Sequence, residues 1–319
     1  MYCINCTDDI FSTLFIENPS VYFPDYVDNY LKSYIRYCNN LLSLNKEKDT
    51  ILHKLTEFQK LIRACLQEHC CGQRHNAKKF FDDALTQIPV MSLCSPVQHN
   101  IYYRARPTKV IEQTGQHVKH TKDEMFHIPF EDRYKVSDQR YSYPGLPCLY
   151  LGESVDVCCE ELEKWDEDLN LAIYRLNTAE KQMLILDLFF FEKYKFDNLT
   201  NEQFVKFVLL WPIVACCSFR YNNPIGMKYR QDYILPQFLL ETIIDNNAMN
   251  VILQRKVHIS GIRYHSARKD FFGDDFSVAS PTYVNYAFPA QKVFPRGYCS
   301  VLLNSFDCRG VFLLSELRK

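Results

Sequence analysis

Apolar residues recur every three or four positions through residues 1 to about 90, which is the period of a helix that buries one face. The same spacing predicts helices over 26–44, 49–66 and 76–88. The clearest stripe, in the second of these segments, consists of Ile51, Leu52, Leu55, Phe58, Leu61, Ile62 and Cys65. The first part of the chain is therefore expected to be mostly helical.

From residue 100 onward the apolar residues gather in short runs that are typical of strands. The predicted strands span 101–104, 147–151, 170–176, 183–188, 257–264 and 310–314. The predicted helices between them span 154–165, 201–210 and 236–245. Because strands and helices do not alternate strictly, this part of the chain is expected to form an α+β domain.

A linker is predicted over 89–100, where Pro89, Ser92, Ser95 and Pro96 interrupt the helical pattern. The sequence thus predicts a helical N-terminal domain at 1–98 and an α+β domain at 99–319.

The 319 residues include 37 basic and 38 acidic side chains, which give a formal net charge of −1. This balance argues against a protein that holds nucleic acid on a basic surface, and no nucleic-acid partner is expected. The longest uncharged apolar run, 207–217, is shorter than the ~20 residues that span a bilayer, and Pro212 interrupts it. No membrane association is expected either.

The fourteen cysteines include adjacent pairs such as Cys70–Cys71 and Cys158–Cys159, which do not resemble a disulfide framework. The acidic residues 1–9 lack the basic start of a secretory signal. Reduced thiols and a cytoplasmic location are therefore expected.

The segment 125–162 carries the densest group of candidate functional residues. Arg140 precedes a Tyr-Pro-Gly turn, Tyr150 ends an apolar strand, and Glu161 lies on a helix that Ser154 can cap. On that helix Glu161 falls at the border of a buried stripe, where a carboxylate can reach a cleft while partly desolvated. Taken singly, the three side chains also fit a salt-bridge partner, a core residue and a surface residue.

Together, the order and spacing of these residues resemble the RES family, NAD-degrading toxins related to ADP-ribosyltransferases. The matching residues are Arg140-Tyr141, the turn at Gly145-Leu146-Pro147, Tyr150, and the helix from Ser154 to Glu161. The resemblance covers about residues 100–319. It implies an ADP-ribosyltransferase-like mixed sheet for the α+β domain.

The chemistry implied by the resemblance is cleavage of NAD at the nicotinamide–ribose bond. Arginine suits the pyrophosphate, and the face of Tyr150 can stack on the cationic nicotinamide ring. Glu161 would stabilise the oxocarbenium-like cation that develops as nicotinamide leaves. Arg140, Tyr150 and Glu161 are accordingly the predicted catalytic residues.

Five further residues are predicted to bind substrate, on the same resemblance. An upstream Tyr-Arg-x-Arg matches the family's opening strand and makes Arg104 a second phosphate contact. Tyr141 is the aromatic that follows the first arginine, and Gln237 stands where compact members carry a serine. Ser266 and Asn285 lie in segments that are similar to longer members, although a strand with its following loop fits those segments equally well.

No cofactor is expected, because NAD would be a consumed substrate. The chain contains no G-x-G-x-x-G, P-loop or G-x-S-x-G motif, which disfavours Rossmann oxidoreductases, P-loop NTPases and a common hydrolase class. Cys3 and Cys6 are weak candidates for a zinc site, since a structural zinc needs four ligands and no standard second pair follows. His127 is expected to be a structural histidine.

The sequence therefore predicts an NAD glycohydrolase or phosphorylase, or an ADP-ribosyltransferase, acting as a toxin or anti-phage effector. Its partners would be NAD and an antitoxin or a trigger protein, with the N-terminal helices serving partner binding, sensing or autoinhibition. The alternative is a non-catalytic module that binds NAD, ADP-ribose or a protein.

Overall fold

The computed structural model separates into two compact units. The first is drawn from Met1–Leu93 and Phe189–Ile243, and the second from Cys94–Leu188, Ile244–Lys269 and Ser280–Lys319. The residues that the structure describes are 4, 9–12, 14–18, 20–111, 114, 117–163, 169–177, 183–192, 194–221, 226–252, 258–266, 283–291 and 294–317.

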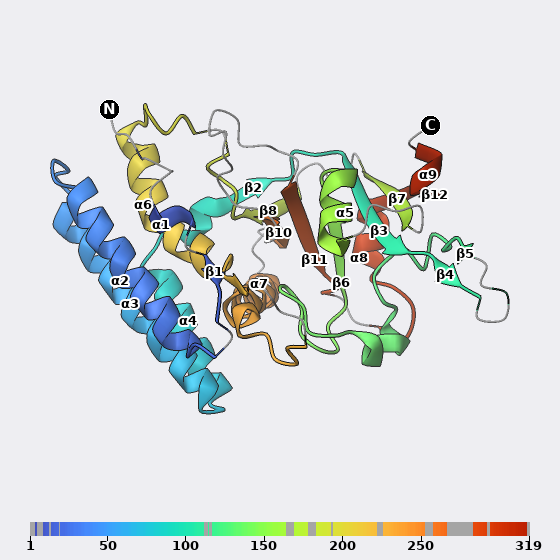
Figure 1. The fold of residues 1–319 in the computed structure, drawn as a ribbon, viewed down its shortest axis with the longest axis horizontal. Coiled ribbons are helices and arrows are strands. Elements are labelled where there is room, and N and C mark those ends of the chain that lie inside the picture. The colour runs from blue at the N-terminus through green and yellow to red at the C-terminus, as the bar shows by residue number, and fades with distance from the viewer. Residues whose placement is uncertain are drawn as a thin grey trace. The chain divides into compact units, whose positions relative to one another are not determined.

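The first unit is helical, with α2, α3 and α4 packed side by side (Figure 1). Its elements are α1 (Asp9–Ser12), β1 (Phe15–Ile16), α2 (Phe23–Leu41), α3 (Lys48–Cys70), α4 (Arg74–Thr86), the 3₁₀ turn Val90–Leu93, α6 (Asn201–Cys216), β9 (Arg220–Tyr221), the 3₁₀ turn Gln231–Tyr233, and α7 (Ile234–Ile252) as far as Ile243. Thr200 and Gln203 form a reciprocal capping box that starts α6. The buried hydroxyl of Tyr34 donates to the carbonyl of Val208, which ties α2 to α6.

The second unit is built on an eight-stranded sheet in the order β12-β7-β3-β6-β11-β10-β8-β2. Its strands are β2 (Cys94–Pro96), β3 (Ile101–Pro107), β6 (Cys148–Gly152), β7 (Leu169–Leu176), β8 (Leu184–Asp187), β10 (Ile259–His265), β11 (Val284–Pro289) and β12 (Phe306–Leu313), with a separate hairpin of β4 (Lys109–Val110) and β5 (His117–Val118). Its helices are the 3₁₀ segment Phe130–Lys135, α5 (Val155–Leu162), the end of α7, α8 (Ser300–Ser305) and α9 (Leu314–Leu317). The β8–β10 pair is parallel and the other pairs in this sheet are antiparallel. The sheet is therefore mixed.

The α+β class and the helical N-terminal region are confirmed, but the division of the chain differs from the predicted 1–98 and 99–319. The N-terminal part of the first unit ends at Leu93, and residues 189–243 belong to this unit as well. The reason is that α6, buried from Phe207 to Cys216, is apolar on all sides and packs against α2 and α3. The predicted linker also contains β2, a three-residue edge strand that ends at Pro96.

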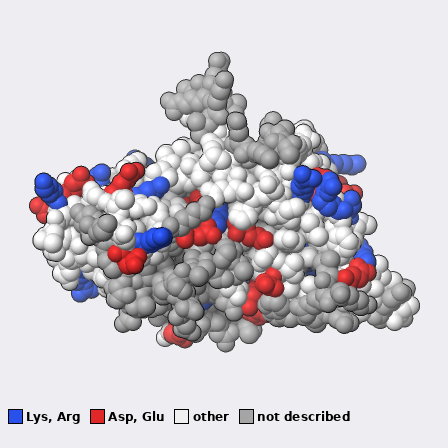
Figure 2. Space-filling model, turned by 90° about the horizontal axis from the view of Figure 1, so that it is seen from above, with Lys and Arg blue, Asp and Glu red and all other residues white. Residues whose placement is uncertain are grey.

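On one face of the molecule, the described charged side chains are mixed rather than sorted by sign (Figure 2). Figure 2 shows Lys and Arg interspersed with Asp and Glu among the described residues of one face. Among the helices that the structure describes, none combines the length and apolar character needed to cross a bilayer.

Gly152 allows α5 to lie close against the sheet (Figure 1). A Cβ at this position would stand 2.5 Å from Val157 Cγ1 and 2.9 Å from Cys158 Sγ, both in the first turn of α5. Gly152→Ala is therefore expected to push α5 outward and to lower the free energy of unfolding by about 1–3 kcal/mol, as overpacking does. Urea unfolding of the variant measures this effect, and a change below about 0.5 kcal/mol would show that the helix is not tightly seated.

Candidate active site

Glu161 lies at the end of α5, and its carboxylate is fixed by two hydrogen bonds. Ser154 starts this helix, because its side chain accepts a hydrogen bond from the backbone N–H of Val157. Glu161 Oε1 accepts from the hydroxyl of Ser266 at 2.6 Å and from the side-chain amide of Asn285 at 2.6 Å. Both donors are buried. Three of the residues predicted for the site, Glu161, Ser266 and Asn285, are thus in direct contact.

Strand register brings Tyr150 to the same face of the sheet as this carboxylate. On β11, Asn285 pairs with Gly152 and Ala287 pairs with Tyr150. Paired residues project to one face, so Tyr150 and Asn285 are diagonal neighbours there. The face is the one covered by α5, because Gly152 meets Val157 and Cys158 of that helix.

The hydroxyl of Tyr150 is held by a tight turn that carries Arg140 and Tyr141. Two backbone hydrogen bonds between Gln139 and Ser142 close this turn around the two residues. The backbone N–H of Tyr141 donates to the Tyr150 hydroxyl at 3.1 Å. Arg140 immediately precedes this contact and is buried.

Tyr150 can be assigned as a neutral hydrogen-bonding group. Its hydroxyl donates to Ser142 Oγ at 3.4 Å. Burial raises the pKa of the Tyr150 phenol well above its ordinary value. The phenol is therefore protonated at neutral pH and can donate a hydrogen bond or stack, but it does not serve as an anionic base.

Tyr264 was not predicted from the sequence and belongs to the same face. It stands opposite Asn285 in the β10–β11 register. Its ring centroid lies 4.6 Å from that of Tyr141, so the turn packs on it. The sequence did contain a local signal, because Tyr264 lies in the same strand-like run as Ser266. An aromatic residue in a strand is, however, equally typical of the hydrophobic core.

Arg104 on β3 lies next to β6. Its Nη1 donates to the backbone oxygen of Tyr150 at 2.9 Å, and burial lowers the pKa of its guanidinium. Its Nε has no hydrogen-bond partner among the described residues. Gln237 belongs to α7 in the first unit and is buried. Contact of Arg104 or Gln237 with a substrate stays a prediction.

A buried charged network lies on the opposite face of the same strands. Arg263 Nε is 3.1 Å from Glu153 Oε1, and Arg263 Nη1 is 3.2 Å from Asp187 Oδ1. The hydroxyl of Tyr286 donates to Glu153 Oε1 at 2.5 Å, and His99 Nε2 lies 3.1 Å from that oxygen. Three members of the network are chain neighbours of residues on the sheet face that carries Glu161. Glu153 follows Gly152, Tyr286 follows Asn285, and Arg263 precedes Tyr264. The network therefore holds the strands that carry the candidate site.

His127 is a structural histidine, as expected. It is 1% exposed, its Nε2 accepts from the backbone N–H of Cys299, and its Nδ1 contacts the carbonyl of Ile128. Because Nε2 accepts, the neutral tautomer carries its proton on Nδ1. Burial lowers the pKa of His127 to about 4.

The shifted pKa of His127 predicts a pH-dependent stability. Unfolded chains bind the proton near the ordinary histidine pKa of about 6.5, so this contribution is complete above pH 6.5 and is lost as the pH falls toward 4. Its size is about 3 kcal/mol. Urea unfolding at pH 7 and pH 4.5 should therefore depend less on pH in His127→Gln than in the wild type. Identical pH dependences would contradict this assignment.

The described residues contain no group of three or more His, Cys, Asp or Glu side chains able to hold a metal ion. Cys3 and Cys6, the weak zinc candidates, lie outside the described residues.

Comparisons with known proteins find similarity to a protein in sequence and to a solved structure. No protein-family model matches the chain. The chain is 27% identical over 298 residues to the Putative toxin YopC of Bacillus subtilis (strain 168), a match that spans 88% of this chain and 64% of that protein. In structure it is similar to one chain of the M. tuberculosis MbcT–MbcA toxin–antitoxin complex, with 12% identity and a TM-score of 0.34, over 72% of this chain and 94% of the other.

Proposed function

We propose that the chain is a toxin that consumes NAD by cleaving the nicotinamide–ribose bond. The observation that carries the proposal is the fixed carboxylate of Glu161, bound by Ser266 and Asn285 on the sheet face that also presents Tyr150. These residues come from one helix and three separate strands or strand ends. A carboxylate oriented in advance is what stabilisation of a transient sugar cation requires.

In the proposed reaction the bond between the nicotinamide nitrogen and ribose C1′ breaks, and its electron pair leaves with neutral nicotinamide. The ribose becomes an oxocarbenium-like cation, which the Glu161 carboxylate stabilises. An acceptor oxygen from water, phosphate or a protein side chain then forms the new bond to C1′ and loses its proton. The two neutral donors on Oε1 keep the carboxylate in place throughout.

The remaining side chains have roles in binding. Arg140, at the tip of the 139–142 turn, would bind the pyrophosphate of NAD. Tyr150 and Tyr141 would contact the end of NAD that carries nicotinamide and its ribose. Arg104 stands close to Tyr150 and is assigned to the same phosphates. The similarity to YopC, a protein whose name marks it as a toxin candidate, supports the biological role. We also propose that an antitoxin or a trigger protein binds the chain, and that the first unit has a regulatory role.

The test is to incubate the purified full chain with NAD, with and without phosphate or cell extract, and to quantify free nicotinamide. Release by the wild type supports an enzyme, whereas binding of NAD without release identifies the non-catalytic alternative. Absence of both overturns the proposal. Mass spectrometry of the other product identifies the acceptor, since water gives ADP-ribose, phosphate gives its phosphorylated form and a protein acceptor gives an adduct.

A further inference from the structure

Tyr264 belongs to the strand that supplies one donor of the Glu161 carboxylate, and it faces the other donor. It lies on β10 opposite Asn285 of β11, so the two side chains project to the same face of the sheet. Ser266 follows Tyr264 by two residues, and both Ser266 and Asn285 donate to Glu161. Tyr264 is therefore built into the frame that fixes this carboxylate.

The ring of Tyr264 also supports the 139–142 turn. Its centroid lies 4.6 Å from that of Tyr141, with an angle of 51° between the ring planes. Tyr141 is 0% exposed and Tyr264 is 9% exposed, so close packing leaves the two rings little freedom to move. The backbone N–H of Tyr141 donates to the Tyr150 hydroxyl on β6. The turn is thus anchored to two strands of the sheet, one through Tyr264 and one through Tyr150.

This anchoring matters because the turn carries Arg140. Arg140 is bonded to Tyr141 along the chain, so a shift of the Tyr141 ring also shifts the backbone from which the guanidinium extends. In NAD the pyrophosphate and the nicotinamide ribose are joined covalently, so Arg140 and Glu161 must stand at a fixed separation to contact both at once. A displacement of about 1 Å is enough to spoil such an arrangement.

We propose that Tyr264 is a positioning residue, which sets the separation between Arg140 and Glu161 by packing against Tyr141. This inference rests on the proposed function. Tyr264 itself is assigned no contact with the substrate. Because the arginine would bind the pyrophosphate in the ground state and in the transition state alike, loss of its position should raise KM for NAD more than it lowers kcat. The aromatic ring carries this role, so phenylalanine should be able to replace the tyrosine.

The experiment measures steady-state nicotinamide release by the full chain carrying Tyr264→Leu or Tyr264→Phe. The leucine variant removes the ring but keeps an apolar side chain in the strand, and its KM for NAD is expected to rise about tenfold while kcat changes less than about threefold. The phenylalanine variant should keep the wild-type KM, since it keeps the ring contact. Tyr264→Met, with a longer apolar side chain, replaces the leucine variant if urea unfolding shows that the latter is not folded.

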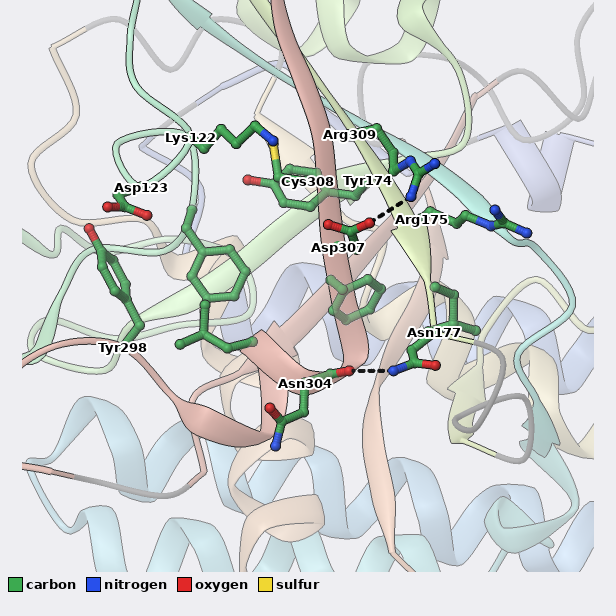
Figure 3. A pocket seen from close by; sticks show the side chains of 14 residues that line it. Lys122, Asp123, Tyr174, Arg175, Asn177, Tyr298, Asn304, Asp307, Cys308 and Arg309 are labelled. Atoms are coloured by element: carbon green, nitrogen blue, oxygen red, sulfur yellow. Dashed lines mark hydrogen bonds and ion pairs between the residues drawn. The ribbon is translucent and has the colours of Figure 1, made fainter.

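Tyr298→Leu is the matched control, because it removes a tyrosine ring from a comparable contact elsewhere in the same unit. The Tyr298 ring packs edge-on against Phe126, with 5.6 Å between the ring centroids. Tyr298 lines a different cavity, of about 860 Å³, which is formed by the ends of β7 and β12 and by α8 (Figure 3). None of the described residues that line this cavity belongs to the turn or donates to Glu161. The control should therefore keep the wild-type KM.

The outcomes distinguish this inference from the proposed function. A wild type that releases no nicotinamide overturns the proposed function, and this inference falls with it. An active wild type whose KM is matched by Tyr264→Leu overturns this inference alone. So does a rise in KM that is equally large in Tyr264→Phe, which would assign the effect to the hydroxyl, or in Tyr298→Leu, which would assign it to general loosening of the fold.

Discussion

Glu161→Gln is expected to lower the rate of nicotinamide release by a factor on the order of 10²–10³, as removal of a main electrostatic stabiliser does. The substitution keeps an oxygen that can accept from Ser266 and Asn285, but it removes the negative charge that would stabilise the ribose cation. Steady-state kinetics should show the loss in kcat, with a smaller change in KM, because ground-state contacts to the substrate are retained.

Glu160→Gln, one residue earlier on α5, is the control for this experiment. Glu160 is not part of the Ser266–Asn285 cluster, so its variant should keep activity close to that of the wild type. Both variants should unfold at similar urea concentrations. Equal activity of the Glu161 variant and the wild type would contradict the assigned role, as would an equal loss in both variants.

Arg263→Leu is expected to lower the free energy of unfolding by about 3–5 kcal/mol, because it leaves buried carboxylates without their cation. Arg263 bridges Glu153 and Asp187, and the side chains of Arg263 and Glu153 are 8% and 4% exposed. Urea unfolding measures the change. Tyr286 and His99 would still donate to Glu153, so the loss falls most heavily on Asp187.

A matched control is Arg309→Leu, which removes an arginine from an exposed ion pair with Asp307 in the same unit. An exposed pair contributes about 0–1 kcal/mol, so this variant should be nearly as stable as the wild type. If both arginine variants lose the same amount, the network on the sheet does not have the structural role assigned to it.

Local periodicity predicted most of the fold. The helices over 26–44, 49–66 and 76–88 correspond to α2, α3 and α4, because one buried face per helix leaves a readable stripe. The membership of α6 in the first unit was not predictable in this way. Its apolar residues surround the helix, so they give no direction to its buried face and no indication of which helices it packs against.

The candidate site was partly predictable, and only where residue type and order carried the signal. Arg140, Tyr150 and Glu161 fall within a single stretch, so their order could be recognised in the sequence. Ser266 and Asn285 contact Glu161 across 105 and 124 residues, and register rather than spacing brings them there. The Arg263 network was missed because an arginine and two carboxylates far apart in sequence look like ordinary surface charges.

The proposed function requires that Arg140, Tyr150 and Glu161 contact one and the same dinucleotide. The most direct measurement is a crystal structure of Glu161→Gln soaked with NAD, since the variant should hold the substrate without cleaving it. The bound NAD is expected to place its ribose C1′ next to residue 161, its nicotinamide ring by Tyr150 and its pyrophosphate by Arg140. An NAD molecule bound elsewhere, with none of these three side chains touching it, would contradict the proposed function.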